Sequence, residues 1–200
     1  MKNVLLTLLL SGFLTTFASQ ASATDTSIIG QISADEESGL LYMREEEKLA
    51  RDVYLTLYER WEVNIFQNIA DSETKHTETI KSLLETYALA DPVLDDSVGI
   101  FTDYHFTELY VALTEAGSTS YEDALRVGIQ IEELDIRDIA EKISKVEDNP
   151  DIVEVYENLM KGSRNHLRSF WKLFQETGLE YEPQYISEEE FNEIVNSPME

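Results

Sequence analysis

Residues 40–61 of this chain read LLYMREEEKLARDVYLTLYERW. Within this stretch, one set of positions recurs at alternating spacings of three and four residues, which is the period of one face of an α-helix. These positions are Leu40, Met43, Glu47, Ala50, Tyr54, Leu57 and Trp61. All of them are apolar except Glu47, so we expect a long amphipathic helix whose buried face carries a carboxylate near its middle.

Three later segments repeat both this period and its interruption by polar residues. The second segment has Phe66, Ile69, Glu73, His76, Ile80, Leu83 and Tyr87 on one face. The third has Leu125, Ile129, Glu132, Ile136, Ile139 and Ile143. The fourth has Ile152, Val155, Leu159, Ser163, His166, Phe170 and Leu173. Pro150 precedes the fourth stripe at a position that a helix start tolerates, and Gly178 ends it.

The connection between the second and third predicted helices is long. Residues 89–121 are interrupted by Pro92 and two glycines, and they contain one short helical piece at residues 108–116. A helical hairpin needs only a few connecting residues, so this segment indicates a crossover. No stretch shows the sustained alternation typical of a strand. We therefore predict an all-α fold, a four-helix bundle over residues 37–178 with a long crossover between helices 2 and 3.

The first 23 residues have the pattern of a secretory signal peptide. Lys2 is followed by an apolar stretch, and Ala21-Ser22-Ala23 fits a cleavage site of small residues. The apolar stretch is too short for a good membrane span. The junction also lacks the cysteine of a bacterial lipoprotein anchor, so we expect no membrane anchor. An uncleaved, buried helix is the alternative interpretation.

The signal peptide predicts an exported protein, located in the periplasm or outside the cell. Residues 24–36 are small and polar, and we expect them to form a flexible N-terminal segment. Residues 179–200 form an acidic C-terminal segment, in which the capping-box pattern at residues 187–190 predicts a short helix.

The composition excludes several classes of function. The chain has 40 acidic and 15 basic residues, a net charge of −25, so we expect no binding to nucleic acid or to anionic lipid. It has no cysteine, which excludes disulfides, thiolate metal sites, iron–sulfur clusters and cysteine nucleophiles. The sequence motifs of classical hydrolases are absent as well.

Polar side chains near the middle of all four apolar faces are the most informative feature. The candidates with metal-ligand chemistry are Glu47, Glu73, His76, Glu132 and His166. A carboxylate turned into an apolar core is costly unless it is paired, and a shared metal would pair all four helices at once. Oxygen and imidazole ligands without sulfur suit iron, manganese or zinc.

Other polar residues have simpler interpretations. A Glu near an apolar stripe can be a solvated boundary residue, which is how we interpret Glu46 and Glu133. His105 lies in the crossover and off any long stripe, so we interpret it as a surface or loop-packing residue.

The chain resembles the ferritin-like superfamily, and within it the rubrerythrin-type bundles. The first helix of rubrerythrins carries Glu-x-x-Ala-Arg-x-x-Tyr, which EKLARDVY at residues 47–54 matches in full. The second-helix motif Glu-x-x-His occurs at residues 73–76, and the third-helix ligand falls on Glu132. More specifically, the chain is similar to a family of bacterial and archaeal ferritin-like proteins whose function is not established. The resemblance covers about residues 37–177.

This resemblance implies a pair of metal ions in the bundle core, two iron ions or else manganese or zinc. It makes Glu47 and Glu132 terminal or bridging ligands and Glu73 a bridging ligand. His76 and His166 would each bind one ion.

The fourth helix departs from the superfamily pattern. That pattern has Glu-x-x-His, whereas this chain has Ser163 at the position of the carboxylate and keeps His166. Asp135, one turn after Glu132, is the candidate replacement. Without it, one metal would be poorly held or a single ion would bind. True rubrerythrins also have a four-cysteine iron site, which is absent here, so a redox reaction would need an external electron donor.

Three functional hypotheses follow. The first is a redox enzyme of the ferroxidase or peroxidase type, in which Tyr54 is either a hydrogen-bond donor or radical-quenching residue near the metals or a core tyrosine. The second is a metal-binding or iron-handling protein without turnover. The third is a structural or interaction bundle with a degenerate site. Bundles of this type often form homodimers, although no separate apolar stripe requires one here.

Overall fold

The computed structural model describes residues 31–200, so the predicted signal peptide lies outside the described residues. The described part of the chain contains six helices and no strand, which confirms the all-α prediction. The helices are α1 (Ala34–Trp61), α2 (Asn64–Thr86), α3 (Tyr104–Gly117), α4 (Tyr121–Ile143), α5 (Pro150–Gln175) and α6 (Glu188–Val195). No helix among these residues is long and apolar enough to cross a membrane.

The start of α1 is fixed by a capping box. The Ser33 side chain accepts from the backbone N–H of Glu36, and the Glu36 carboxylate accepts from the N–H of Ser33. Glu36 also accepts hydrogen bonds from Glu147 and Asn149, which tie this end of α1 to the connection between α4 and α5. As a result α1 begins at Ala34, three residues before the predicted boundary at residue 37.

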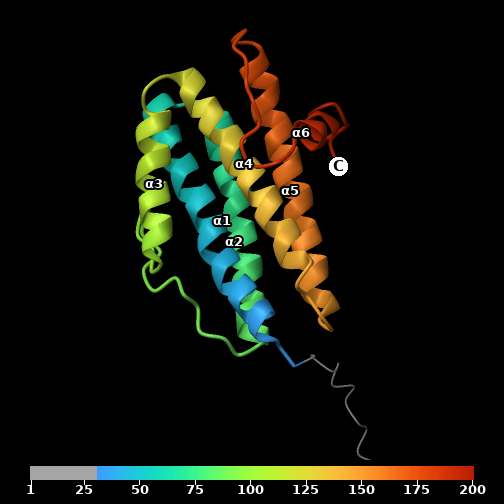
Figure 1. Cartoon of the computed structure of the whole chain (residues 1–200). Helices are drawn as coiled ribbons and strands as arrows, with labels where there is room; N and C mark the ends of the chain where they lie inside the picture. Colours follow the sequence, from blue (N-terminus) through green and yellow to red (C-terminus); the bar gives the residue numbers. More distant parts are fainter. Residues whose placement is uncertain (1–30) are drawn as a thin grey trace, which may run out of the picture.

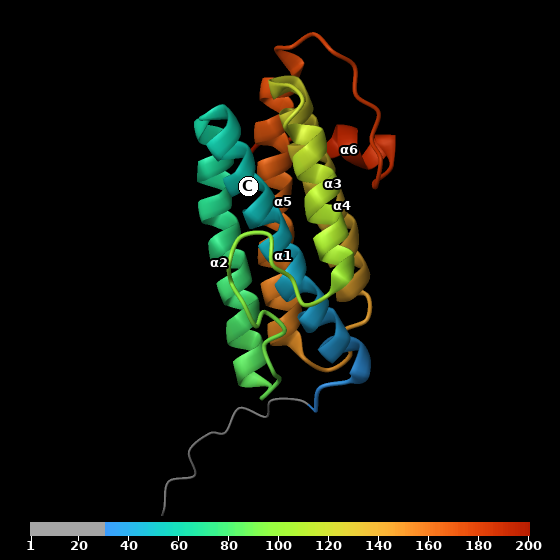
Figure 2. The same cartoon turned by 90° about the vertical axis from the view of Figure 1, so that its left-hand side faces the viewer.

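Four long helices, α1, α2, α4 and α5, lie side by side (Figures 1 and 2). The most extensive packing joins α1 to α2 and α4 to α5, and contacts of α1 with α4 and of α2 with α5 complete the set. The short helix α3 packs on the outside against α1 and α4. Because α3 runs back along the molecule, α2 and α4 point in the same direction (Figure 1).

The connection between α2 and α3 is fastened to α1 by charged side chains. Figure 1 shows it running from the end of α2 to the start of α3. Lys48 and Asp52 form a fully buried ion pair of 2.5 Å, and they also bond Ser97 and Gly99 of the connection. Glu45 accepts from the backbone of residues 102–103. The connection covers a face of α1 that the other long helices leave open, and every residue from 43 to 54 is buried, not one face alone.

The apolar interior is divided into two clusters by a polar layer. One cluster includes Leu49, Val53, Phe66, Ile129 and Phe170. The other includes Leu40, Met43, Ile80, Ile139 and Leu159. Between them lie buried polar residues of all four long helices. The interruptions of the four apolar stripes therefore lie at the same level of the molecule.

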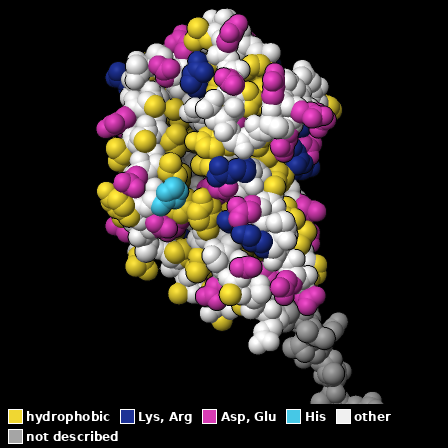
Figure 3. All heavy atoms as spheres, in the orientation of Figure 1, with side chains coloured by type: hydrophobic (Ala, Val, Ile, Leu, Met, Phe, Trp, Pro, Cys, Tyr) yellow, Lys and Arg dark blue, Asp and Glu magenta, His cyan; other side chains and the backbone are white. Residues whose placement is uncertain are grey.

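The C-terminal segment packs on α4 and α5. Phe191 and Ile194 of α6 are buried, and Glu133 of α4 accepts hydrogen bonds from the Tyr181 hydroxyl and from the backbone of residues 184–185. The interpretation of Glu133 as a solvated residue is therefore wrong, because the segment that follows α5 covers it. Figure 3 shows acidic side chains spread over one face of the molecule.

Candidate metal centre

Glu73 and His76 of α2 face Glu47 of α1 in the polar layer. They are three residues apart and leave α2 on the same side. His76 Nδ1 lies 2.7 Å from Glu73 Oε2 and 3.2 Å from Glu47 Oε2. Both carboxylates are buried, and the His76 side chain is 13% exposed. These three residues form one group with ligand atoms within 4.8 Å of one another.

A second group forms around the other oxygen of Glu73. His166 Nδ1, from α5, lies 2.8 Å from Glu73 Oε1 and 3.5 Å from Glu132 Oε2 of α4. The rings of His76 and His166 stack with their centroids 5.6 Å apart. Because Glu73 belongs to both groups, its carboxylate connects two adjacent sets of ligand atoms. The structure thus brings together all five residues that interrupt the stripes with ligand chemistry.

Several of these close contacts are not hydrogen bonds. Within the described residues, Glu47 Oε1, Glu73 Oε2 and His166 Nδ1 are buried without a hydrogen-bond partner. Native proteins leave few buried polar atoms unpaired. Carboxylate oxygens and imidazole nitrogens that crowd together in the interior, some of them without an aligned hydrogen bond, are the arrangement expected of ligands that share a cation. The donor set of carboxylate oxygens and imidazole nitrogens therefore fits a pair of metal ions.

Electrostatic crowding shifts the pKa values of these groups. Burial lowers the pKa of His76, but the negative charges of Glu73 and Glu47 outweigh burial and raise it to about 12. The same balance, with Glu73 and Glu132 as neighbours, raises the pKa of His166 to about 10. Burial raises the pKa of Glu47 to about 7. Without a bound cation, the histidines hold protons that offset the buried carboxylates.

Asp135, the predicted replacement ligand, lies beside the centre. Its Oδ2 accepts a hydrogen bond from the Ser163 hydroxyl, and its Oδ1 has no partner among the described residues. Asp135 belongs to neither of the two groups of ligand atoms. Burial raises its pKa well above the usual range, and the nearby charges of Glu47 and Glu73 raise it further. The small Ser163 side chain thus faces a carboxylate of α4 across the interior.

Tyr54 is in contact with one of the candidate ligands. Its hydroxyl donates a 2.5 Å hydrogen bond to Glu132 Oε1, and the residue is fully buried. Its ring packs against Phe170 with centroids 5.2 Å apart. Tyr54 is therefore both a core residue and a hydrogen-bond donor to the centre, and the two interpretations made from the sequence are compatible.

Comparison with known proteins assigns the chain to a family. Residues 36–198 match a family model described as "Uncharacterized protein domain (DUF2202)". The chain belongs to the DUF2202 family. It is 56% identical over 169 residues to the uncharacterized protein MJ0754 of Methanocaldococcus jannaschii, a match that covers 84% of this chain and 91% of the relative.

A solved structure has the same fold as this DUF2202 domain. The crystal structure of hypothetical protein MJ0754 from Methanococcus jannaschii DSM 2661 matches with a TM-score of 0.83 and 54% identity. The match covers 84% of this chain and 96% of that chain.

Gly162 is a residue of the candidate site in this DUF2202 domain that the sequence did not reveal. A Cβ at this position would lie 2.6 Å from His76 Cε1 and 2.7 Å from His76 Nε2. Glycine therefore lets the backbone of α5 approach the imidazole closely. A glycine inside a predicted helix was the available signal, but it did not indicate which side chain occupies the space.

Glu46 was interpreted as a solvated boundary residue, and this is wrong. It is 3% exposed, and within the described residues neither of its carboxylate oxygens has a hydrogen-bond donor. Other buried carboxylates of this domain, such as Glu36, Glu45 and Glu133, accept hydrogen bonds from backbone N–H groups. His105 agrees with its interpretation, since it is exposed in the first turn of α3.

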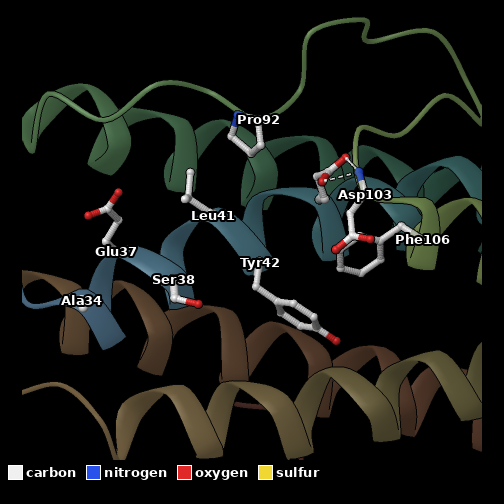
Figure 4. Close-up of a pocket in the computed structure, with 9 residues that line it drawn as sticks. Ala34, Glu37, Ser38, Leu41, Tyr42, Pro92, Asp103 and Phe106 are labelled. Atoms are coloured by element: carbon white, nitrogen blue, oxygen red, sulfur yellow. Dashed lines mark hydrogen bonds between the residues drawn. The ribbon is translucent and has the colours of Figure 1, made fainter.

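An open cleft of about 420 Å³ lies near the N-terminal end of α1, between α1, α3 and the connection before α3 (Figure 4). Its lining includes Glu37, Tyr42, Pro92 and Phe106. The five candidate ligands do not line this cleft.

Proposed function

We propose that this protein is an exported, ferritin-like metal-binding protein that holds two metal ions between its four long helices. One observation carries the proposal. Glu47, Glu73 and His76 form one set of ligand atoms, Glu73, Glu132 and His166 form a second, and unpartnered buried atoms occur in both.

The arrangement of the helices supports the ferritin-like assignment. Four long helices pack together around the polar layer, and the long connection with α3 makes α2 and α4 run in the same direction. Four-helix bundles with one long crossover have this topology, and carboxylate metal centres in their cores take ligands from all four helices. The match of residues 47–54 to the rubrerythrin motif supports the same assignment.

Iron is the metal that we propose, with manganese or zinc as alternatives that the same ligands accept. Glu73 would bridge the two ions, because each of its oxygens faces a different histidine. Asp135 would supply the fourth negative charge, which balances the four positive charges of two divalent ions. The hydroxyl of Ser163 orients that carboxylate.

Iron or manganese bound at this centre would supply redox chemistry toward peroxide or oxygen, and the centre could also oxidise ferrous iron. Tyr54 orients Glu132 through its hydrogen bond. The apolar clusters on both sides of the polar layer keep bulk water from the carboxylates. The chain has no cysteine to hold an iron–sulfur centre, so turnover would depend on an external electron donor. The alternatives are metal binding without turnover and a degenerate site in a structural bundle.

The experiment is a measurement of metal content by plasma mass spectrometry after exposure to ferrous iron, manganese and zinc together. In the unmodified protein we expect about two bound metal ions per chain. We expect both to be lost in the Glu73→Ala/His76→Ala variant. The matched control is His105→Ala/Glu108→Ala, which removes the same two residue types at the same spacing from the exposed face of α3.

The outcomes separate the hypotheses. Loss of the two ions in the Glu73/His76 variant, with full content in the control, supports the pair. A single bound ion in the unmodified protein would mean that Ser163 leaves one of the two positions too weak. Equal metal content and equal stability in all three proteins would leave the degenerate-site interpretation. Addition of peroxide and a reductant to the loaded protein then distinguishes turnover from binding.

A further inference from the structure

The open cleft near the start of α1 carries negative charge at both of its ends. Glu37, Leu41 and Glu45 are four residues apart on one side of α1, and all three line the cleft. At a rise of 1.5 Å per residue, the two glutamates are separated by about 12 Å along the helix axis. Figure 4 shows Glu37 at one end of the cleft and Asp103 at the other. The apolar side chain of Leu41 lies between these two ends.

Backbone hydrogen bonds hold the carboxylates at the Asp103 end in place. Glu45 is buried and accepts from the N–H groups of Thr102 and Asp103. The Asp103 side chain accepts from the N–H of His105 at 2.9 Å and caps α3. Both carboxylates retain lone pairs for a further donor. They therefore form a fixed pair of acceptors where the connection enters α3.

Apolar side chains form most of the remaining lining, which includes Leu41, Tyr42, Pro92 and Phe106. The rings of Tyr42 and Phe106 lie with their centroids 5.1 Å apart. Lys142 Nζ lies 4.4 Å from the centroid of the Tyr42 ring, within the range of a cation–π contact. The cleft volume of about 420 Å³ falls in the range of about 300–1,000 Å³ that is typical of small-molecule sites. The cleft thus combines an apolar wall with a few polar groups, as such sites do.

The lining of the cleft contains no basic side chain that balances its carboxylates. Three carboxylates line it and, within residues 31–200, no Lys, Arg or His does. The basic residues that flank Glu45 in sequence are paired elsewhere, Arg44 with Asp91 and Lys48 with Asp52. A ligand that is complementary to the cleft therefore carries a positive charge at each end of an apolar chain.

We propose that this cleft binds a linear aliphatic diamine or polyamine. One ammonium group binds at Glu37, and the other binds between Glu45 and Asp103. The methylene chain packs against Leu41 and Pro92. Each ammonium group has three donors, and its hydrogen bonds to carboxylates are strengthened by charge. The site is separate from the metal centre, because none of the five candidate metal ligands lines the cleft.

Equilibrium dialysis of the unmodified protein against labelled spermidine, at physiological ionic strength, tests this site. Salt at this concentration screens the general attraction of cations to an acidic surface. We expect one bound spermidine per chain, displaced by diaminooctane but not by octylamine, which has the same chain and only one ammonium group. Chelator treatment should leave the binding unchanged, so the result is independent of the proposed pair of metal ions.

Single substitutions locate the site. Ser38 lines the cleft and is exposed, so Ser38→Trp fills the cleft without changing any charge and should abolish binding. Its matched control is Ser82→Trp, at an exposed position of α2, which should bind normally. Glu37→Gln removes one charged end and should weaken binding about fivefold, the upper value for one exposed ion pair. Its control is Glu59→Gln, which neutralises an exposed glutamate near the other end of α1.

Several results would overturn the proposed amine site. One is the absence of bound spermidine, and another is unchanged binding in Ser38→Trp. Equal displacement by octylamine and diaminooctane would show that the second ammonium group is not recognised. Equal weakening in Glu37→Gln and Glu59→Gln would mean general attraction to the acidic surface. None of these results affects the proposed metal pair, which is tested by the Glu73/His76 variant.

Discussion

Each carboxylate oxygen of Glu73 faces a different histidine, His76 from its own helix and His166 from α5. The positive charges of the two imidazoles lower the pKa of Glu73 despite its burial, whereas Glu47 and Glu132 have raised pKa values, chiefly because of burial. The three carboxylates are equivalent in sequence terms, but their surroundings place Glu73 where it would bridge the proposed pair of ions.

The two histidines predict an unusual dependence of stability on pH in chelator-treated protein. Their pKa values in the folded state, about 12 for His76 and about 10 for His166, lie above the ordinary value of 6.5. A raised pKa stabilises the fold below pH 6.5, and this contribution is lost as the pH rises toward the folded-state values. We expect the free energy of unfolding to fall from pH 7 to pH 9 by roughly 1 kcal/mol per pH unit for each histidine.

Denaturant unfolding at several pH values, with and without manganese, measures this effect. Metal ligands are unprotonated imidazoles, so in the loaded protein the trend should disappear or reverse. The Glu73→Ala/His76→Ala variant should show a weaker slope, since it lacks one of the two histidines and a neighbouring charge. Parallel slopes in the loaded and chelated proteins would contradict metal binding at these residues.

At the scale of the helices, Gly162 allows the backbone of α5 to lie close to His76 of α2. The imidazole of His76 occupies the space that a side chain at this position would need. α5 contributes His166 one turn later, so the same stretch of helix provides one candidate ligand and the space for another.

Gly162→Ala should therefore displace His76 and weaken metal binding. Overpacking of a close contact costs about 1–3 kcal/mol, and in an exposed helix position the same change would stabilise. We expect a lower metal content together with lower stability, measured by plasma mass spectrometry and denaturant unfolding. The control is Lys161→Ala, on the exposed side of α5. Full metal content in Gly162→Ala would show that His76 does not need its present position.

For the whole molecule, the polar layer across all four long helices is the part that a cation would stabilise most. It separates two apolar clusters and contains carboxylates from α1, α2 and α4. The N-terminal cap of α1 and the Lys48–Asp52 ion pair stabilise parts of the fold outside the polar layer, and neither needs a metal.

Metal removal should consequently lower the melting temperature without unfolding the protein at room temperature. A ligand that binds only the folded state, at a free concentration of 100 times its dissociation constant, adds about 2.7 kcal/mol to the free energy of unfolding. Each 1 kcal/mol corresponds to roughly 2–4 °C for a chain of this size. Calorimetry with and without a chelator measures the shift. The Glu73→Ala/His76→Ala variant should lose most of it, and an unmodified protein indifferent to chelators would contradict the proposal.

The sequence alone determined the helical class, the position of the long helices and the residues that meet in the polar layer. Its information was periodicity: a residue that interrupts a stripe of period 3.6 must lie on the buried face, whatever the rest of the fold does. Glu47, Glu73, His76, Glu132 and His166 could be identified in this way.

Only the tertiary structure decided what happens to residues outside those stripes. Glu46 and Glu133 are buried because segments distant in sequence cover or face them, and a periodic pattern within one helix contains no information about such cover. The same holds for Gly162, since its role depends on the imidazole of another helix. Burial of the main face is a property of each helix, whereas burial of its other faces depends on how the connections are routed.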